Sequence, residues 1–130
     1  MESEKGRLSA LKMAFGRYRE ALLIRSDELH RDGTIQRFEY TLENAWKALK
    51  AELLRRGVDA NSPREVFRLS AREGLIGDVG MWFDFVEKRN LASHVYREED
   101  AKAIEAIFET FERAVLELIA TLEAPQERAP

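Results

Sequence analysis

The chain has 130 residues, of which 45% are apolar and 35% charged, and this composition predicts one compact domain rather than a disordered chain. It contains no cysteine, which excludes disulfides, thiolate nucleophiles and thiolate metal sites. The net charge of −3 argues against a general nucleic-acid coat protein, so any contact with RNA or a nucleotide must come from a local patch.

Two long helices are predicted first. Apolar residues from Leu8 to Leu22 step by three and four, the spacing that aligns one face of an α-helix. Residues 30–33 (HRDG) predict a turn, and a second helix follows over Thr34–Arg56 until Gly57 favours a left-handed stop. The apolar stripe of this helix consists of Ile35, Phe38, Leu42, Ala45, Trp46, Leu49 and Leu53.

A short helix and an unusually apolar helix are predicted next. Ser62 and Glu65 around Pro63 form a helix-start signature, and Gly74 ends the short helix. Asp78 caps the next helix, predicted over 79–92. Its apolar side chains cover most of its circumference, which favours burial against a second copy of the chain; they are Met81, Trp82, Phe83, Phe85 and Val86.

The last helix is predicted as one continuous element from the acidic turn at 98–100 to Ile119. We expect a single domain over residues 1–123 and a flexible C-terminal tail over 124–130. The predicted fold class is therefore all-α, an antiparallel up-and-down bundle of four long helices plus one short helix, which dimerises.

The sequence shows no segment of the kind that targets or spans a membrane, so no membrane partner is expected. The N-terminal sequence MESEKGRLSALKMAF lacks the apolar core of a signal peptide, and no apolar run approaches membrane-spanning length. We therefore expect a cytoplasmic protein.

Residues 88–100 (KRNLASHVYREED) contain the candidate site. On a continuous helix, Arg89 and His94 would point about 140° apart, so the helix must end near Ser93. Arginine binds phosphate oxygens in a fork, and histidine transfers protons near neutral pH. The pair is therefore suited to cleaving RNA, with His94 moving a proton and Arg89 stabilising charge on phosphorus. By itself the pattern is also compatible with a helix cap and a surface ion pair of Arg89 with Glu87 or Asp84.

Four blocks of sequence resemble a known family. They are residues 37–47 (RFEYTLENAWK), Ser62-Pro63-Arg64 followed by Phe67-Arg68, residues 74–76 (GLI), and Arg89-Asn90-x3-His94-x-Tyr96. Together, over about residues 8–120, they resemble the HEPN superfamily (higher eukaryotes and prokaryotes nucleotide-binding). They are most similar to the small prokaryotic nucleotidyltransferase substrate-binding proteins.

This resemblance implies a dimeric, metal-independent ribonuclease toxin, paired with a minimal nucleotidyltransferase antitoxin. It assigns catalysis to Arg89 and His94 at the dimer interface, and AMP modification to Tyr96. Asn90 is expected either to bind phosphate or to hydrogen-bond the loop backbone. Relatives often carry an acidic residue directly after the tyrosine, where this chain has Arg97; this departure leaves the proposed catalytic residues in place and bears on partner docking or modification.

A second function remains open, in which the protein is a non-catalytic subunit that presents a nucleotide or another substrate to a nucleotidyltransferase. A purely structural adaptor is the third. No cofactor and no metal are expected, because Glu39 and Glu43, although one turn apart, are typical of a solvated helix face. His30 is assigned to a polar turn, and Trp46 to the core or an interface.

Overall fold

The structure is a bundle of helices, and the computed structural model describes residues 4–24, 28–93 and 97–124. Within these residues every regular element is an α-helix, which confirms the predicted all-α class. In chain order the helices are α1 (Glu4–Leu22), α2 (Glu28–Arg55), α3 (Pro63–Arg72), α4 (Val79–Ala92), α5 (Glu98–Glu105) and α6 (Phe108–Glu123).

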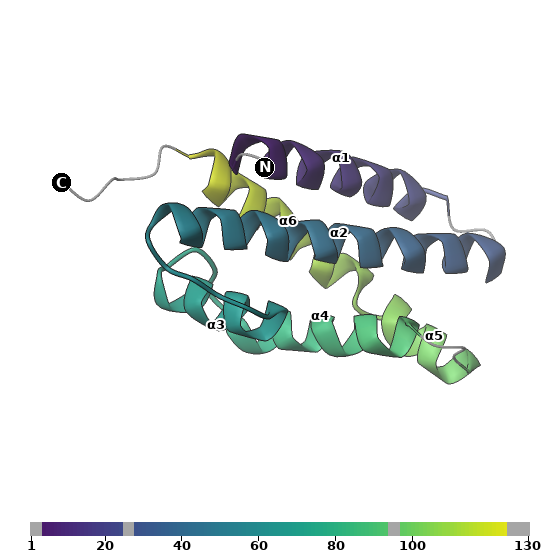
Figure 1. Ribbon diagram of the computed structural model, residues 1–130. Helices are drawn as coiled ribbons and strands as arrows, with labels where there is room; N and C mark the ends of the chain where they lie inside the picture. Colours follow the sequence, from purple (N-terminus) through teal and green to yellow (C-terminus); the bar gives the residue numbers. More distant parts are fainter. Residues whose placement is uncertain (1–3, 25–27, 94–96, 125–130) are drawn as a thin grey trace.

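The long helices run up and down beside one another (Figure 1). α1 and α2 are antiparallel neighbours, and α4 lies along the opposite side of α2. α3 connects α2 to α4 at one end of the bundle, while α5 lies at the other end. α6 then runs back through the bundle, so that both ends of the described chain lie at the same end of the molecule.

Phe111 of α6 is at the centre of the core. Its ring contacts Phe38 of α2 edge-on at a centroid distance of 4.7 Å, Phe85 of α4 at 5.0 Å and Tyr18 of α1 at 5.3 Å. All four side chains are at most 1% exposed. Edge-to-face aromatic pairs of this kind each stabilise by about 0.5–1.5 kcal/mol beyond their area burial. Four helices are therefore joined through one aromatic cluster.

The predicted turn at residues 30–33 is wrong, because α2 begins at Glu28 and passes through Gly33 without interruption. Thr34 supports the helix by donating a hydrogen bond from its hydroxyl to the carbonyl oxygen of His30 at 2.8 Å. Thr34 and Ile35 are buried, at 5% and 1% exposed. A glycine inside a helix costs only about 1 kcal/mol, and tertiary packing of this kind outweighs it.

The last predicted helix is interrupted, which the sequence did not predict. α5 ends at Glu105 and α6 begins at Phe108. Between them the amide of Ile107 donates to the carbonyl of Ile104 at 3.1 Å, a tighter turn than that of an α-helix. The hydroxyl of Tyr18 donates to the carbonyl oxygen of Phe108 at 2.7 Å, inside the core. The described chain therefore has a second short helix where one long helix was expected.

The predicted helix starts and stops around α3 and α4 are confirmed. The amide of Glu65 donates to the hydroxyl of Ser62 at 3.2 Å, and the amide of Met81 donates to the carboxylate of Asp78 at 3.0 Å. Gly57 and Gly74 have φ angles of 81° and 77°, the left-handed conformation that favours glycine at the end of a helix.

The apolar side chains of α4 are only partly covered by the chain's own core. Trp82 and Phe85 are 2% and 1% exposed. Met81, Phe83 and Val86 lie on other sides of the helix and are half-buried. This is the pattern from which dimerisation was predicted, and dimerisation stays a prediction.

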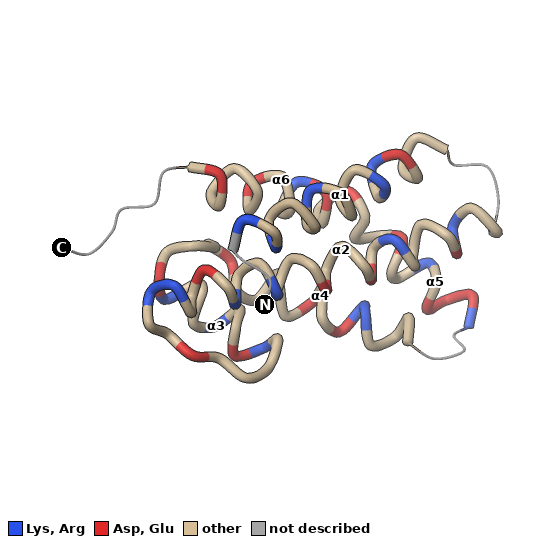
Figure 2. Tube along the Cα trace, turned by 45° about the horizontal axis from the view of Figure 1, so that its top comes forward, with Lys and Arg blue, Asp and Glu red and all other residues tan. Residues whose placement is uncertain are grey.

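Basic and acidic residues are interspersed along the described helices (Figure 2), in keeping with the net charge of −3. None of the helices in the described ranges is long and apolar enough to cross a membrane.

Candidate functional site

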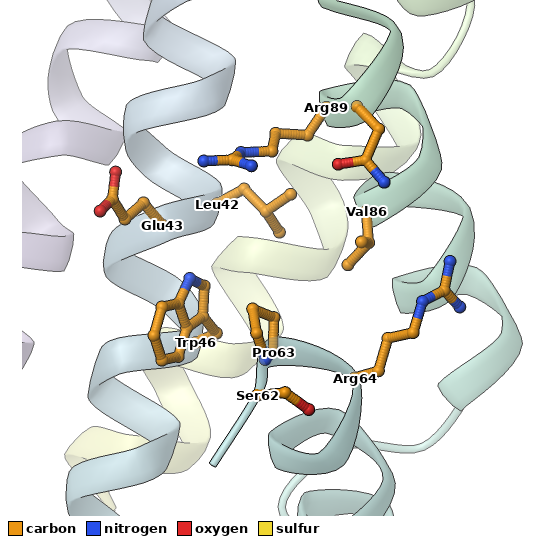
Figure 3. A pocket seen from close by; sticks show the side chains of 9 residues that line it. Leu42, Glu43, Trp46, Ser62, Pro63, Arg64, Val86 and Arg89 are labelled. Atoms are coloured by element: carbon orange, nitrogen blue, oxygen red, sulfur yellow. The ribbon is translucent and has the colours of Figure 1, made fainter. Parts of the chain in front are cut away.

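A groove of about 330 Å³ lies where α2, α3 and α4 meet (Figure 3). We call it the α2–α3–α4 groove. Its volume is at the lower end of the range for small-ligand pockets, which is about 300–1,000 Å³. The residues that line it are Leu42, Glu43, Trp46, Ser62, Pro63, Arg64, Val86, Arg89 and Asn90.

The α2 wall of the groove follows from helical spacing. Trp46 follows Leu42 by four residues and Glu43 by three, so its side chain lies beside both of theirs on α2. Leu42 is 2% exposed and forms part of the floor, whereas Trp46 is half-buried. Glu43 forms an ion pair with Lys47 at 3.1 Å on the same helix.

The α3 wall is held by its helix start. Besides the cap from Ser62, the carboxylate of Glu65 accepts a hydrogen bond at 2.7 Å from the amide of Asn61. Pro63 stands at the first helical position, where its fixed φ favours the helix and no amide is lost. These contacts fix the backbone of Pro63 and Arg64 beside the groove (Figure 3).

Arg89 enters the groove from the last turns of α4, with its guanidinium directed toward α2 (Figure 3). Its side chain is exposed, and among the described residues it forms no ion pair and no side-chain hydrogen bond. The anticipated surface partners are engaged elsewhere, because Asp84 pairs with Lys88 at 2.7 Å and Glu87 faces Arg64 at 3.8 Å. The Arg89 guanidinium is therefore available to an anionic ligand.

Glu39 lies one turn before Glu43 on α2, close enough to Arg89 for the two charges to interact. Burial raises the pKa of the Glu39 carboxyl above its usual value, and the positive charge of Arg89 opposes that rise in pKa only in part. The burial of this carboxyl is thus unfavourable at neutral pH, when it is ionised. Its negative charge draws the Arg89 guanidinium toward α2.

α4 ends directly after Arg89 and Asn90. The Ser93 hydroxyl donates to the carbonyl oxygen of Arg89 at 3.0 Å, and the Ser93 amide donates to that of Asn90 at 3.3 Å. The helix therefore ends near Ser93, as predicted. Two of the predicted site residues, Arg89 and Asn90, line the same groove. The other two, His94 and Tyr96, lie outside the described residues.

The described chain resumes at Arg97, and an ion pair fixes the position of α5 directly behind it. Arg31 of α2 donates two hydrogen bonds to the carboxylate of Glu98, at 2.6 and 3.0 Å. The Arg31 hydrogen bonds lower the pKa of the Glu98 carboxyl. The amide of Arg97 donates to Asp100 at 3.2 Å. The start of α5 is thereby tied to the start of α2.

Some residues of the groove were not predicted from the sequence. Trp46 was assigned to the core or an interface, and Arg64 only to a helix start, yet both line the groove. Their meeting depends on how α2 packs against α3, which no local pattern encodes. Arg68 and Arg72, one turn apart on α3, are not among the lining residues. Within the described ranges no third carboxylate or histidine joins Glu39 and Glu43 to form a possible metal site.

Comparison with known proteins places this fold among its relatives. A sequence model of the family described as nucleotidyltransferase substrate binding protein like matches residues 6–124. A crystal structure of a protein from Thermus thermophilus superimposes with a TM-score of 0.81 at 34% identity, over 87% of this chain and 98% of that chain. HI0074 from Haemophilus influenzae, described as a substrate binding domain of a nucleotidyltransferase, gives a TM-score of 0.79 at 26% identity, over 88% and 98%.

A curated relative is the probable ribonuclease HepT of Haemophilus influenzae. It is 32% identical over an alignment of 84 residues, and the match covers 61% of this chain. The match spans 58% of the length of that relative.

Proposed function

We propose, from the premise that the chain belongs to the family of nucleotidyltransferase substrate binding proteins, that it is an RNA endonuclease that needs no metal. The observation that carries the proposal is Arg89, an exposed guanidinium without an ion pair in the described chain, directed over a groove of nucleotide size. In the sequence Arg89 is followed five residues later by His94, the chain's candidate for proton transfer. The name of the HepT relative, a probable ribonuclease, supports the same reaction class.

The proposed reaction uses the 2′-hydroxyl of the RNA itself as nucleophile. His94 accepts the hydroxyl proton while the oxygen attacks the adjacent phosphorus and the bond to the 5′-oxygen breaks. The products are a 2′,3′-cyclic phosphate and a free 5′-hydroxyl, which takes up one proton. Arg89 stabilises the charge that develops on the phosphoryl oxygens. Two copies of His94, one from each protomer of a dimer, supply the base and the acid.

Tyr96 is the proposed site of control by a nucleotidyltransferase partner. Its phenolic oxygen attacks the α-phosphorus of ATP, so that AMP is joined to the tyrosine and pyrophosphate leaves. The tyrosine proton passes to solvent. The attached AMP carries the base and the phosphate of an RNA unit, and it blocks access of RNA to His94. The protein then acts as a toxin that its partner silences.

The second candidate is a subunit that presents a substrate without cleaving it. The description of the family and of HI0074 as substrate binding supports this alternative. It uses the same groove and predicts nucleotide affinity in a protein that has no ribonuclease activity.

The deciding experiment incubates purified protein with mixed RNAs in EDTA, after intact mass has shown Tyr96 to be unmodified. We expect the wild type to cleave, His94→Ala to be inactive, and Arg89→Ala to be slower by about 10²–10³-fold. Arg72→Ala, which removes an exposed arginine from the far end of α3, is the matched control and should cleave as the wild type does. Cleavage by His94→Ala at the wild-type rate would reject the ribonuclease proposal. Nucleotide binding without any cleavage would establish the substrate-presenting alternative.

A further inference from the structure

The α2–α3–α4 groove combines an apolar floor with charged edges. Leu42, Trp46, Pro63 and Val86 form the apolar part. Arg89 extends over this floor from the α4 side, and Arg64 stands on the α3 side (Figure 3). A ligand that fits has a flat apolar part and an anionic part at short distance. A nucleotide has both, in its base and its phosphate.

Trp46 differs from the other tryptophan of the chain in its surroundings. Trp82 is 2% exposed, is stacked on Phe67 at 5.1 Å, and meets Phe85 edge-on at 5.2 Å. Trp46 is half-buried, and no aromatic ring of the described chain stacks on it. A tryptophan that lines a groove with part of its surface exposed is a platform on which a base can stack, since every base has a π-face.

The charges at the groove favour an anion. Arg89 forms no ion pair within the described residues, and the contact of Arg64 with Glu87 is long, at 3.8 Å, between side chains that are 45% and 65% exposed. Such exposed pairs contribute little and are easily exchanged for a stronger partner. The Arg64 guanidinium also lies 5.3 Å above the ring of Phe83, which limits its freedom. The one acidic lining residue, Glu43, is paired with Lys47, and Glu39, one turn earlier on α2, places a second negative charge near Arg89.

We propose that the α2–α3–α4 groove binds one nucleotide unit of single-stranded RNA, with its base stacked on Trp46 and its phosphates held by Arg89 and Arg64. This rests on the proposed ribonuclease function and assigns it a substrate class. Unpaired RNA is selected because the base must leave its stack to reach Trp46, and a duplex cannot provide it. The groove volume of about 330 Å³ suits one such unit.

The experiment measures binding apart from cleavage. The probe is a fluorescein-labelled 2′-O-methyl RNA octamer, which lacks the attacking hydroxyl and cannot be cleaved by the proposed reaction. The four free nucleoside monophosphates form a second arm, which distinguishes a free nucleotide from a unit within a chain. Binding is followed by anisotropy and by quenching of tryptophan fluorescence. Because Trp82 is buried, it supplies a constant signal and Trp46 the variable one.

We expect Trp46→Leu to weaken octamer binding by about 5- to 150-fold, the range for the loss of one stacked base. Trp46→Phe keeps an aromatic ring and should bind within about threefold of the wild type. Tyr40→Leu is the matched control, because Tyr40 is a 58% exposed aromatic residue on the same helix and does not line the groove. Arg64→Ala should weaken binding and reduce its salt dependence by about one phosphate contact.

Each outcome separates this inference from the ribonuclease proposal. Unchanged octamer affinity in folded Trp46→Leu overturns the inference, even if the wild type cleaves RNA through His94. If Trp46→Leu keeps its octamer affinity but is a monomer where the wild type is a dimer, the groove is a contact between two copies. That outcome overturns the inference as well. Affinity only for free nucleotides would overturn the assignment to an RNA chain. Reduced affinity in Trp46→Leu, with a wild-type unfolding curve and wild-type dimer mass, supports it.

Discussion

The carboxylate of Glu52 gives the strongest test of how α2 and α3 are held together. It is 1% exposed and accepts hydrogen bonds from Arg55 at 3.0 and 2.7 Å and from Arg56 at 2.7 Å. Arg56 also donates to the carbonyl oxygen of Glu73 at 3.2 Å, at the end of α3. We predict that Glu52→Ala destabilises the fold, because it leaves two arginines beside the core without their buried partner.

The magnitude follows from the burial of the charges. Removing one partner of a buried ion pair costs about 3–5 kcal/mol. Both arginine side chains keep some contact with water, at 21% and 22% exposed, so the lower limit of about 3 kcal/mol applies here. For a chain of 130 residues this lowers the Tm by about 11 °C. Glu52→Gln preserves the shape and one acceptor, and its loss should be smaller.

Thermal and urea unfolding, followed by circular dichroism at one fixed protein concentration, measure this loss. The control is Glu123→Ala, which removes an ion pair with Lys12 at 2.6 Å whose side chains are 46% and 52% exposed. That pair should contribute less than about 1 kcal/mol. If Glu52→Ala lost no more than Glu123→Ala, the buried cluster would not be what holds α3 against α2, and the reasoning would be refuted.

Three further predictions concern single side chains. Tyr18→Phe removes a buried 2.7 Å hydrogen bond to the first turn of α6 and should lower the free energy of unfolding in urea by about 1 kcal/mol. An unchanged free energy of unfolding would show that this bond does not stabilise the fold. Glu98→Gln should destabilise the fold at pH 7 but not well below pH 4. Hydrogen bonds from Arg31 lower the pKa of Glu98, so the stabilisation by its carboxylate is lost as the pH falls through that pKa. An equal loss of stability at both pH values would contradict this reasoning. Glu39→Gln should instead stabilise the fold at pH 7, because burial raises the pKa of Glu39 and its ionisation in the folded state is unfavourable. This gain in stability should vanish near pH 4, where the carboxyl is protonated. Destabilisation at pH 7 would show that attraction to the neighbouring Arg89 outweighs burial.

Helix boundaries were predictable where a local chemical signal decides them. Ser62 and Asp78 cap their helices through their own side chains, and Gly57 and Gly74 adopt the left-handed conformation that few other residues accept. These signals act within four residues, so the sequence alone contains them. The all-α class follows equally from the apolar spacing along each helix.

Boundaries that depend on distant contacts were not predictable. Gly33 resembles a turn residue, but its neighbours Thr34 and Ile35 are buried, and this packing keeps the helix continuous. The sequence has no proline or glycine near the interruption before Phe108 that would indicate it. It is accompanied by a hydrogen bond from Tyr18, ninety residues earlier in the chain. Local propensity cannot report a contact of that separation.

Two lining residues of the groove were named from the sequence, but its other walls were not. Arg89 was selected by its residue type and its distance from His94, and Asn90 through the family resemblance; both line the α2–α3–α4 groove. The groove itself needs Trp46 from α2 and Arg64 from α3, which come together only through tertiary packing. His94 and Tyr96 remain predictions from the sequence, because they lie outside the described residues.

The way charges are satisfied in this chain distinguishes structural from functional positions. Glu52 and Glu98 each accept two or more guanidinium hydrogen bonds; Glu98 connects α5 to α2, and Glu52 holds Arg56, which reaches the end of α3. Around the groove the pattern reverses, because burial raises the pKa of Glu39 and Arg89 forms no ion pair in the described chain. A sequence selected for stability alone would place Glu39 in solvent or pair Arg89 directly. The charge of Glu39 acts on the Arg89 guanidinium without a direct ion pair, so an anion in the α2–α3–α4 groove would be the direct partner of this arginine. The proposed phosphate site rests on the position of Arg89 beside the α2–α3–α4 groove, together with its spacing from His94 in the sequence.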